Sequence, residues 1–308
     1  MLTITGLKKS YKGFPVLREL NMHIEKGDIY GFIGTNGCGK TTTMNIICSI
    51  IAKDDGDIVF ENENTKIGYL PETPALYGYM TAYEYLNFIG ACCEYEGDIN
   101  ERTSQVLALV GMTESGRRKI KGYSRGMNQR IGIAAALYTN PELLILDEPT
   151  SALDPEGRAE IIEIVRRLAA DGTTIILCTH ILTDIERVAN KVGILKDGRM
   201  VIEGKISDVK GMFMGTNAVN IKLAYTPVDT HPICHIDNIE RYEIVNNGVT
   251  LFAKPGITEA QLFYKAVTTL AENQILPEAV QLQRLSLEQI YMGINSGALN
   301  LSLERSSI

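Results

Sequence analysis

Alternating apolar and polar positions dominate the start of the chain. Residues 1–33 alternate around a KGFPVL turn and then run into DIYGFIG, which predicts a small antiparallel set of strands leading to one buried strand. From Thr41 onward the pattern TTMNIICSII has helical spacing, and residues 55–70 return to a strand pattern. Residues 74–121 show mostly helical spacing, for example in TAYEYLNFIGACCEY and SQVLALVGM. We therefore expect strands, one helix, further strands and then a helical region.

Two short apolar runs follow, ELLILDEP and TTIILCTH, and both are typical of buried parallel strands. Between them, GRAEIIEIVRRLAADG has the spacing of an amphipathic helix, with Gly172 at its C-terminal end. Parallel strands joined by a helix predict an α/β domain. We place the end of this domain near residue 210.

The remaining residues, 211–308, have a different pattern. VNIKLAY, RYEIVNNGVTLFAK and EAVQLQR favour strands, and the pair Asn247-Gly248 is a strong hairpin-turn signal. TEAQLFYKAVTTLAEN favours a helix, with Thr258 as its N-cap. These elements predict a smaller C-terminal α+β domain, and no catalytic constellation occurs in it.

Composition and charge narrow the class of protein. The 308 residues are 45% hydrophobic, enough for a buried core, and the net charge is −7. An acidic chain without a block of lysine and arginine is a poor candidate for binding nucleic acid through its phosphates. No apolar run is long enough to span a bilayer, and the first residues lack a signal-peptide pattern, so we expect a protein of the cytoplasm.

The six cysteines have no framework spacing, which fits reduced thiols in that compartment. The segment HPICH, from His231 to His235, could be read as a metal site. Without a second cluster of ligands, a buried Cys234 thiol between surface histidines is the favoured interpretation.

A phosphate-binding loop is the strongest chemical signal. GTNGCGKT, Gly34 to Thr41, fits G-x-x-x-x-G-K-[ST], follows an apolar strand and opens a helix. Its glycines let backbone N–H groups converge on phosphate oxygens at a helix N-terminus. Lys40 would reach the β- and γ-phosphates, and Thr41 would offer its hydroxyl to magnesium. Cys38 is interpreted as a small filler, with an oxidation-sensitive thiol as the alternative.

Acidic residues end the strand-like run LLILDE. Carboxylates at the end of a buried strand lie at the sheet edge where open α/β folds bind ligands. Asp147 would hold magnesium there, and Glu148 would polarise a water for attack on the γ-phosphate. His180 follows the next apolar run. It can be a core histidine, or it can hydrogen-bond the γ-phosphate and Glu148 at the same edge.

Six segments in order give the chain a family resemblance. Tyr11, GTNGCGKTT, GYLPE, YSRGMNQR, LLILDEPTSALDP and the histidine of CTHIL closely resemble the ATP-binding subunits of ABC transporters. The resemblance covers residues 1–210. GYLPE, YSRGM and the separate C-terminal domain look most like the branch that serves drug, bacitracin and lantibiotic export or self-immunity.

The resemblance implies a P-loop NTPase with a RecA-like core, an antiparallel β subdomain and a helical subdomain. It implies that Tyr11 stacks on adenine. It also implies that Ser124 and Gly126 of the signature loop face a γ-phosphate bound by the opposite subunit, and that Asp154 belongs to the loop contacting that subunit's site. The phosphate loop implied to bind ATP comprises Gly34, Thr35, Asn36, Gly37, Cys38, Gly39, Lys40, Thr41 and Thr42.

Two positions depart from the family pattern. Glu72 stands where much of the family has a glutamine that contacts magnesium or the attacking water and moves with the membrane subunit. Its carboxylate can still bind magnesium, so it joins Thr41 and Asp147 as a metal candidate. Arg125 stands where the common signature has glycine, and it can add charge toward phosphate or point to solvent.

The preferred hypothesis is an ATP-hydrolysing subunit that lies at the cytoplasmic face of the membrane and energises a separate permease. It would act as a homodimer or pair with a second ATP-binding subunit, using ATP and Mg²⁺. Export of a drug, an antibiotic peptide or a similar substrate follows from the resemblance alone. The alternatives are a soluble ABC ATPase, such as one for iron–sulfur assembly, and a regulatory module that no longer hydrolyses ATP.

Overall fold

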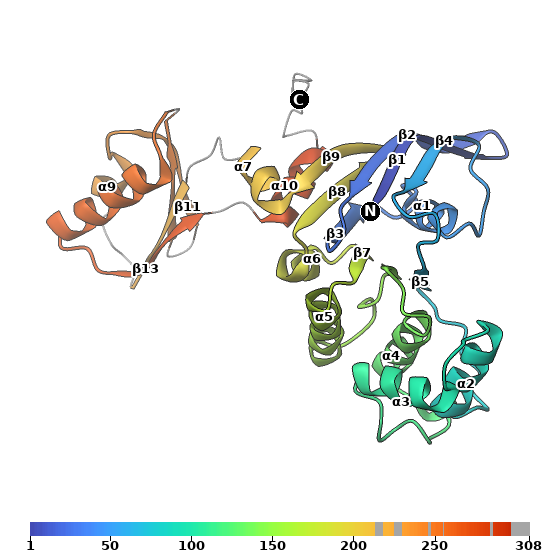
Figure 1. Ribbon diagram of the computed structural model, residues 1–308. Coiled ribbons are helices and arrows are strands. Elements are labelled where there is room, and N and C mark those ends of the chain that lie inside the picture. The colour runs from blue at the N-terminus through green and yellow to red at the C-terminus, as the bar shows by residue number, and fades with distance from the viewer. Residues whose placement is uncertain (213–217, 225–229, 246–247, 255, 284–285, 297–308) are drawn as a thin grey trace. The chain divides into compact units, whose positions relative to one another are not determined.

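A computed structural model describes residues 1–308 except 213–217, 225–229, 246–247, 255, 284–285 and 297–308 (Figure 1). By its internal contacts the chain divides into two compact units, Met1–Ile206 and Ser207–Ile308. The sequence-based boundary at residue 210 falls within helix α7 (Ile206–Met212), which begins where the units divide. In the described part of the chain, no helix combines the length and the apolar character needed to cross a membrane.

A six-stranded sheet, in the order β5-β6-β7-β3-β8-β9, organises the first unit. Its first five strands run parallel and β9 pairs antiparallel with β8. Every residue of β6 and β7 is buried, which explains their continuous apolar runs. The strands are β3 (Ile29–Gly34), β5 (Ile67–Leu70), β6 (Leu143–Asp147), β7 (Thr174–Cys178), β8 (Lys191–Lys196) and β9 (Arg199–Lys205).

Helices connect these parallel strands, as the sequence pattern predicts. They are α1 (Lys40–Ile47), α5 (Pro155–Ala170) and α6 (Leu182–Val188). The side chain of Asp154 caps α5 and Pro155 opens it, and Gly172 follows its last turn with φ of 91°. The α/β prediction is confirmed.

A three-stranded antiparallel sheet, in the order β2-β1-β4, flanks the phosphate loop. Its strands are β1 (Leu2–Tyr11), β2 (Phe14–Ile24) and β4 (Asp55–Phe60). Buried side chains from this sheet share one apolar cluster with α1 and the parallel sheet, including Leu7, Leu20, Met44, Phe32 and Leu143. This common core fixes α1, and therefore the phosphate loop before it, between the two sheets.

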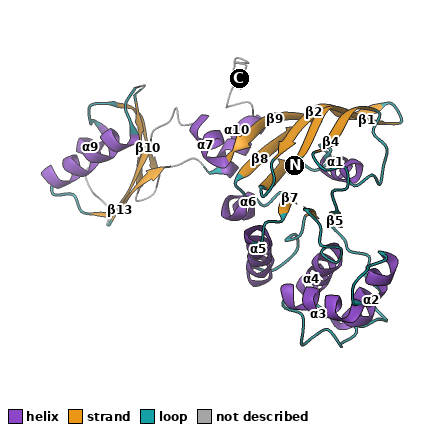
Figure 2. Cartoon of the chain, viewed as in Figure 1, coloured by secondary structure: helices purple, strands orange, loops and turns teal. Residues whose placement is uncertain are grey.

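Residues 82–136 form a helical region, which begins later than the predicted range of 74–121 and extends beyond it to the end of α4 (Figure 2). It contains α2 (Ala82–Cys92), α3 (Ile99–Leu109), a 3₁₀ turn (Ile120–Gly122) and α4 (Arg125–Ala136). Arg102 of α3 is 6% exposed and donates to the carbonyls of Leu137 and Tyr138, which follow the last turn of α4. A buried guanidinium therefore satisfies backbone acceptors at the C-terminal end of that helix.

The second unit contains a four-stranded antiparallel sheet in the order β11-β12-β10-β13. With a helix after the first and third strands, this is a β-α-β-β-α-β arrangement. Thr258 caps α9 in a reciprocal pair with Gln261, which confirms the predicted N-cap. The elements are β10 (Ala218–Leu223), α8 (His231–Cys234), β11 (Ile239–Val245), β12 (Gly248–Ala253), α9 (Glu259–Glu272), β13 (Pro277–Gln283) and α10 (Leu287–Ser296).

Two sequence signals fall in this unit. Asn247 of the predicted hairpin turn lies outside the described residues, but β11 and β12 pair antiparallel on either side of it, from Val245↔Gly248 onward. Cys234 is buried, and the rings of His231 and His235 stack with centroids 3.9 Å apart. Within the described ranges, no group of three or more metal-binding side chains occurs.

Candidate functional site

The phosphate loop joins β3 to α1, and its glycines are required by its geometry. Gly37 and Gly39 have φ of 80° and 114°, in the region that other residues rarely adopt. At Gly34 a Cβ would collide with the Cys38 sulfur and lie 2.7 Å from the Leu195 carbonyl oxygen. Each glycine therefore lets the chain make the tight curl that turns backbone N–H groups inward.

The side chain of Lys40 lies inside this curl. It is 7% exposed, and its Nζ donates to the carbonyl oxygens of Gly34 at 2.7 Å and Thr35 at 3.3 Å. In the described part of the chain, α1 has no side-chain cap, since Gly39 occupies the N-cap. The ammonium group and the free first N–H groups of α1 together form a site suited to a phosphate.

Carboxylates face this cation across the site. The Thr41 hydroxyl donates to Asp147 Oδ2 at 2.9 Å, and Asp147 is 1% exposed. Its other oxygen, Oδ1, is buried without a hydrogen-bond partner among the described residues. Burial raises the pKa of the Asp147 carboxyl above 3.8, and the nearby Glu148 and Glu72 raise it further, while the Thr41 hydrogen bond lowers it.

Glu148 and His180 form a pair at the carboxyl ends of β6 and β7. The Glu148 backbone N–H donates to the Cys178 carbonyl at 2.8 Å, and its φ is 51°. This left-handed backbone turns the residue out of β6. Glu148 Oε2 lies 2.8 Å from His180 Nδ1, and the histidine side chain is 57% exposed. The carboxylate is thus oriented by an imidazole at the mouth of the site.

These groups surround one cavity of about 430 Å³. It brings together ten of the residues predicted from the sequence: Asn36, Gly37, Gly39, Lys40, Thr41, Thr42, Glu72, Asp147, Glu148 and His180. It also includes Val16 of β2, which no sequence motif indicates. Gly34, Thr35 and Cys38 belong to the same loop but do not line the cavity.

Tyr11, predicted to contact adenine, does not line this cavity. It ends β1, is 44% exposed, and has Lys9 Nζ 5.5 Å from its ring centroid. An exposed aromatic face of this kind remains available for stacking.

The thiol of Cys38 is buried, and burial raises its pKa although Lys40 acts in the opposite direction. A raised pKa favours the interpretation of Cys38 as a small filler over its interpretation as an oxidation-sensitive thiol.

The other predicted site residues gather elsewhere in the first unit. Ser124 caps α4 by accepting from the Met127 N–H, and Asp154 caps α5 by accepting from the Gly157 N–H. With Gly126 they line a hollow of about 330 Å³ whose lining residues differ from those of the first cavity. Two sets of candidate phosphate ligands therefore lie apart in one chain.

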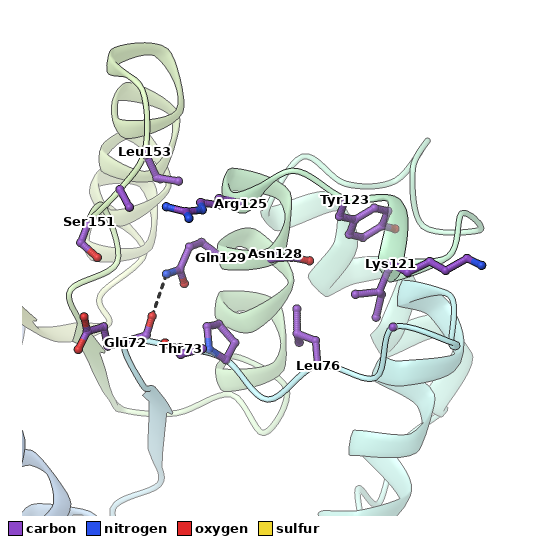
Figure 3. Close-up of a pocket in the computed structure, with 14 residues that line it drawn as sticks. Glu72, Thr73, Leu76, Lys121, Tyr123, Arg125, Asn128, Gln129, Ser151 and Leu153 are labelled. Carbon is purple, nitrogen blue, oxygen red and sulfur yellow. Dashed lines mark hydrogen bonds between the residues drawn. The ribbon is translucent and has the colours of Figure 1, made fainter.

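A third hollow, of about 580 Å³, is lined by residues of α4 and of the loop after β5 (Figure 3). Glu72 lines both this hollow and the phosphate cavity. Gln129 Nε2 donates to the Glu72 carbonyl oxygen at 3.2 Å across it. No sequence motif indicates a role for Gln129.

Comparisons with known proteins agree with this arrangement of site residues. Residues 17–151 match the protein family described as ABC transporter. The linearmycin resistance ATP-binding protein LnrL of Bacillus subtilis is 31% identical, over 97% of this chain and 99% of the relative. The lantibiotic transport ATP-binding protein SrtF of Streptococcus pyogenes is 39% identical, over 66% of this chain and 90% of the relative.

A solved structure shares the fold of the first unit. It is the dimeric post-hydrolysis state of the ATP-binding cassette MJ0796 bound to ADP and Pi. The TM-score is 0.60 at 25% identity, covering 67% of this chain and 99% of that chain. Together with the full-length relative, this shows that the chain belongs to the ABC transporter ATP-binding proteins and is an ATPase of that family.

Proposed function

We propose that this chain binds Mg²⁺–ATP and hydrolyses it to energise a separate membrane permease that exports a drug or antibiotic peptide. The proposal places it peripherally on the cytoplasmic face of the membrane. The observation that carries the hydrolytic role is the convergence of Lys40, Asp147 and the Glu148–His180 pair on one cavity. Phosphoryl transfer to water needs a cation that binds phosphate, acidic residues that bind a metal ion, and an oriented base.

The residues present fit magnesium. Asp147 Oδ1 is an orphaned, buried carboxylate oxygen, and the Thr41 hydroxyl lies beside the same carboxylate. Hard oxygen ligands of this kind suit Mg²⁺. Asp147 and Thr41 would hold the ion, with Glu72 nearby on the cavity wall. Bound there with ATP, Mg²⁺ neutralises charge that develops on the phosphate oxygens.

Each residue then has a separate role. Lys40 and the first N–H groups of α1 bind the β- and γ-phosphates. Glu148 accepts a hydrogen bond from the attacking water and orients it, while His180 holds the Glu148 carboxylate in place at 2.8 Å. Tyr11 stacks on the adenine from the end of β1.

The chain acts in a pair with a second ATP-binding subunit. Ser124 and Gly126 sit at the N-terminus of α4, where a hydroxyl, N–H groups and the helix dipole favour an anion. They lie outside the cavity that holds Lys40, so the phosphate they bind belongs to the other subunit. Asp154 contributes to the same intersubunit surface.

An exposed aromatic patch supports docking to the permease. Tyr77, Tyr79 and Phe88 are 42%, 69% and 41% exposed, and the ring of Tyr77 lies 5.8 Å from each of the other two. Contiguous exposed aromatics of this kind mark protein interaction sites. Tyr77 and Tyr79 belong to the same loop as Glu72, which connects a partner bound there to the phosphate cavity through the chain. The resistance role named for the full-length relative supports export.

The dimer is tested with Glu148→Gln. This change removes the water-orienting carboxylate but keeps the shape of the side chain, so ATP is bound and not cleaved. We expect a stable dimer on size-exclusion chromatography with Mg²⁺–ATP. Glu163→Gln, on the exposed face of α5, is the control and should remain able to cycle. A Glu148→Gln protein that stays monomeric with ATP would overturn the proposed dimer.

The permease is tested by purifying the tagged chain from detergent-solubilised membranes of its own cell. We expect a polytopic membrane protein to copurify, and Tyr79→Glu to lose it. Tyr264→Glu is the control, because Tyr264 is 73% exposed on α9, outside the patch. Copurification of a soluble iron–sulfur assembly scaffold instead would favour the soluble ABC ATPase.

A further inference from the structure

Helix α4 packs directly against β5 and the loop that follows it. A Cβ on Gly68 of β5 would collide with the carbonyl oxygen of Ala136, in the last turn of α4. One turn earlier, a Cβ on Gly132 would lie 2.5 Å from Leu70 Cδ1 and 3.0 Å from Pro74 Cγ. Small residues thus bring the two backbones together, and this contact leaves little room for α4 to slide along β5.

Gln129 extends this contact face by one more turn, since it precedes Gly132 by three residues. Gln129 is 7% exposed, and its Nε2 donates to the Glu72 backbone oxygen at 3.2 Å (Figure 3). A carbonyl can only accept, so the amide nitrogen must face Glu72. Gln129 Oε1 is buried with no partner among the described residues, so this bond is the polar contact that holds the side chain.

The bond joins two groups that serve different nucleotides in the proposed dimer. Glu72 lines the cavity of Lys40, which holds the subunit's own ATP. Gln129 lies one turn along α4 from Ser124 and Gly126, which face the ATP of the other subunit. A shift of α4 is therefore passed to the backbone of Glu72 through this buried amide as well as through the packing of Gly132 against Pro74.

We propose that Gln129 is a positioning residue that couples the two ATP sites. Its amide makes the loop carrying Glu72 move with the phosphate-binding end of α4. The inference rests on the proposed dimer. We expect this coupling to be favourable, and because coupling between sites is reciprocal, ATP at either site then raises the affinity of the other by the same factor. Loss of one such hydrogen bond should weaken the coupling by about fivefold.

The test uses the full chain carrying Glu148→Gln, so that binding is measured without hydrolysis. Sedimentation velocity records the fraction of dimer against ATP concentration. Gln129→Leu removes the donor, and Gln129→Glu replaces it with an oxygen that repels the Glu72 carbonyl. Asn128→Asp is the matched control, because it makes the same amide-to-acid change on the neighbouring residue. Nucleotide-free unfolding temperatures and ATP affinity of the monomer without Mg²⁺ are measured for each variant.

Both Gln129 variants should need about fivefold more ATP for half-maximal dimer formation, while Asn128→Asp behaves as its parent does. Monomer affinity for ATP should stay unchanged, which a general loss of structure would not allow. Lowering the pH from about 8 to about 6 should restore dimer formation in Gln129→Glu, because a buried carboxylic acid can donate to Glu72 once protonated. Gln129→Leu should show no such recovery.

The outcomes distinguish a failure of this inference from a failure of the proposed function. If the Glu148→Gln parent does not dimerise with ATP, the proposed dimer fails. If the parent dimerises and both Gln129 variants dimerise at the same ATP concentration, the coupling role of Gln129 is wrong. A loss that is confined to Gln129→Glu and equalled by Asn128→Asp would also overturn it, because the effect would then come from charge in the hollow.

Discussion

Asp147→Asn should make the nucleotide-free protein more stable while it stops hydrolysis. The wild-type carboxylate has one oxygen bonded to Thr41 at 2.9 Å and a second, Oδ1, buried without a partner in the described structure. An unsatisfied buried polar atom costs about 1–3 kcal/mol. In the variant, the amide oxygen still accepts from Thr41, and the amide nitrogen can donate toward the neighbouring acids. We therefore expect the free energy of unfolding to rise by about 1–3 kcal/mol.

The gain in the free energy of unfolding should increase with pH. Burial and the nearby Glu148 and Glu72 hold the pKa of Asp147 above 3.8, so folding favours its protonated form. The carboxyl therefore stabilises the fold at acid pH, and this contribution is lost as the pH rises through the raised pKa. The advantage of Asp147→Asn should be small at acid pH and grow toward neutral pH.

Calorimetry in EDTA without nucleotide measures this gain, with roughly 2–4 °C in Tm expected per kcal/mol for a unit of this size. Asp171→Asn is the control, because Asp171 is exposed at the end of α5 and its change should leave Tm in place. The reasoning is refuted if Asp147→Asn is no more stable than wild type at neutral pH, or if its advantage does not grow with pH.

Three further changes test other parts of the site and fold. Lys40→Ala should weaken ATP binding about 10- to 100-fold by calorimetry, because a charge-assisted bond to phosphate is lost, and unchanged affinity would contradict the phosphate-loop assignment. His180→Ala should slow ATP hydrolysis at least about 100-fold with little change in ATP affinity, since Glu148 loses its orienting partner; a normal rate would remove His180 from the mechanism. Arg102→Met should lower the free energy of unfolding in urea by about 2–4 kcal/mol, because two buried carbonyls lose their donor. Arg118→Met, at an exposed position, should be neutral, and an equal loss there would assign the effect to charge.

Local patterns account for most of the fold and for the chemistry of the site. The phosphate loop and the two acids at the end of β6 are each contiguous in sequence, and backbone geometry alone links their residue types to phosphate and metal. The N-caps at Thr258 and Asp154 are likewise local signals, read within three residues.

The sequence pattern does not predict contacts between distant segments. Val16 reaches the cavity because β2 packs against the loop at Gly39, where a Cβ would lie 2.6 Å from Leu17 Cδ2. Gln129 meets Glu72 only because small residues on α4 and β5 allow their backbones to approach. In the second unit, β13 pairs with β10 and not with β12, which precedes it, and neither apolar pattern nor turn residues specify that partner.

The positive φ of Glu148 restricts which amino acids can occupy position 148 even before any chemistry is considered. At 51°, glycine, asparagine and aspartate can occupy the position at low cost, whereas valine or isoleucine would be strained by their branched Cβ. A saturation library sorted for folded protein alone should therefore lose the β-branched residues here, whatever their effect on hydrolysis. Evolutionary drift at this proposed catalytic position is confined by backbone conformation as well as by selection for activity.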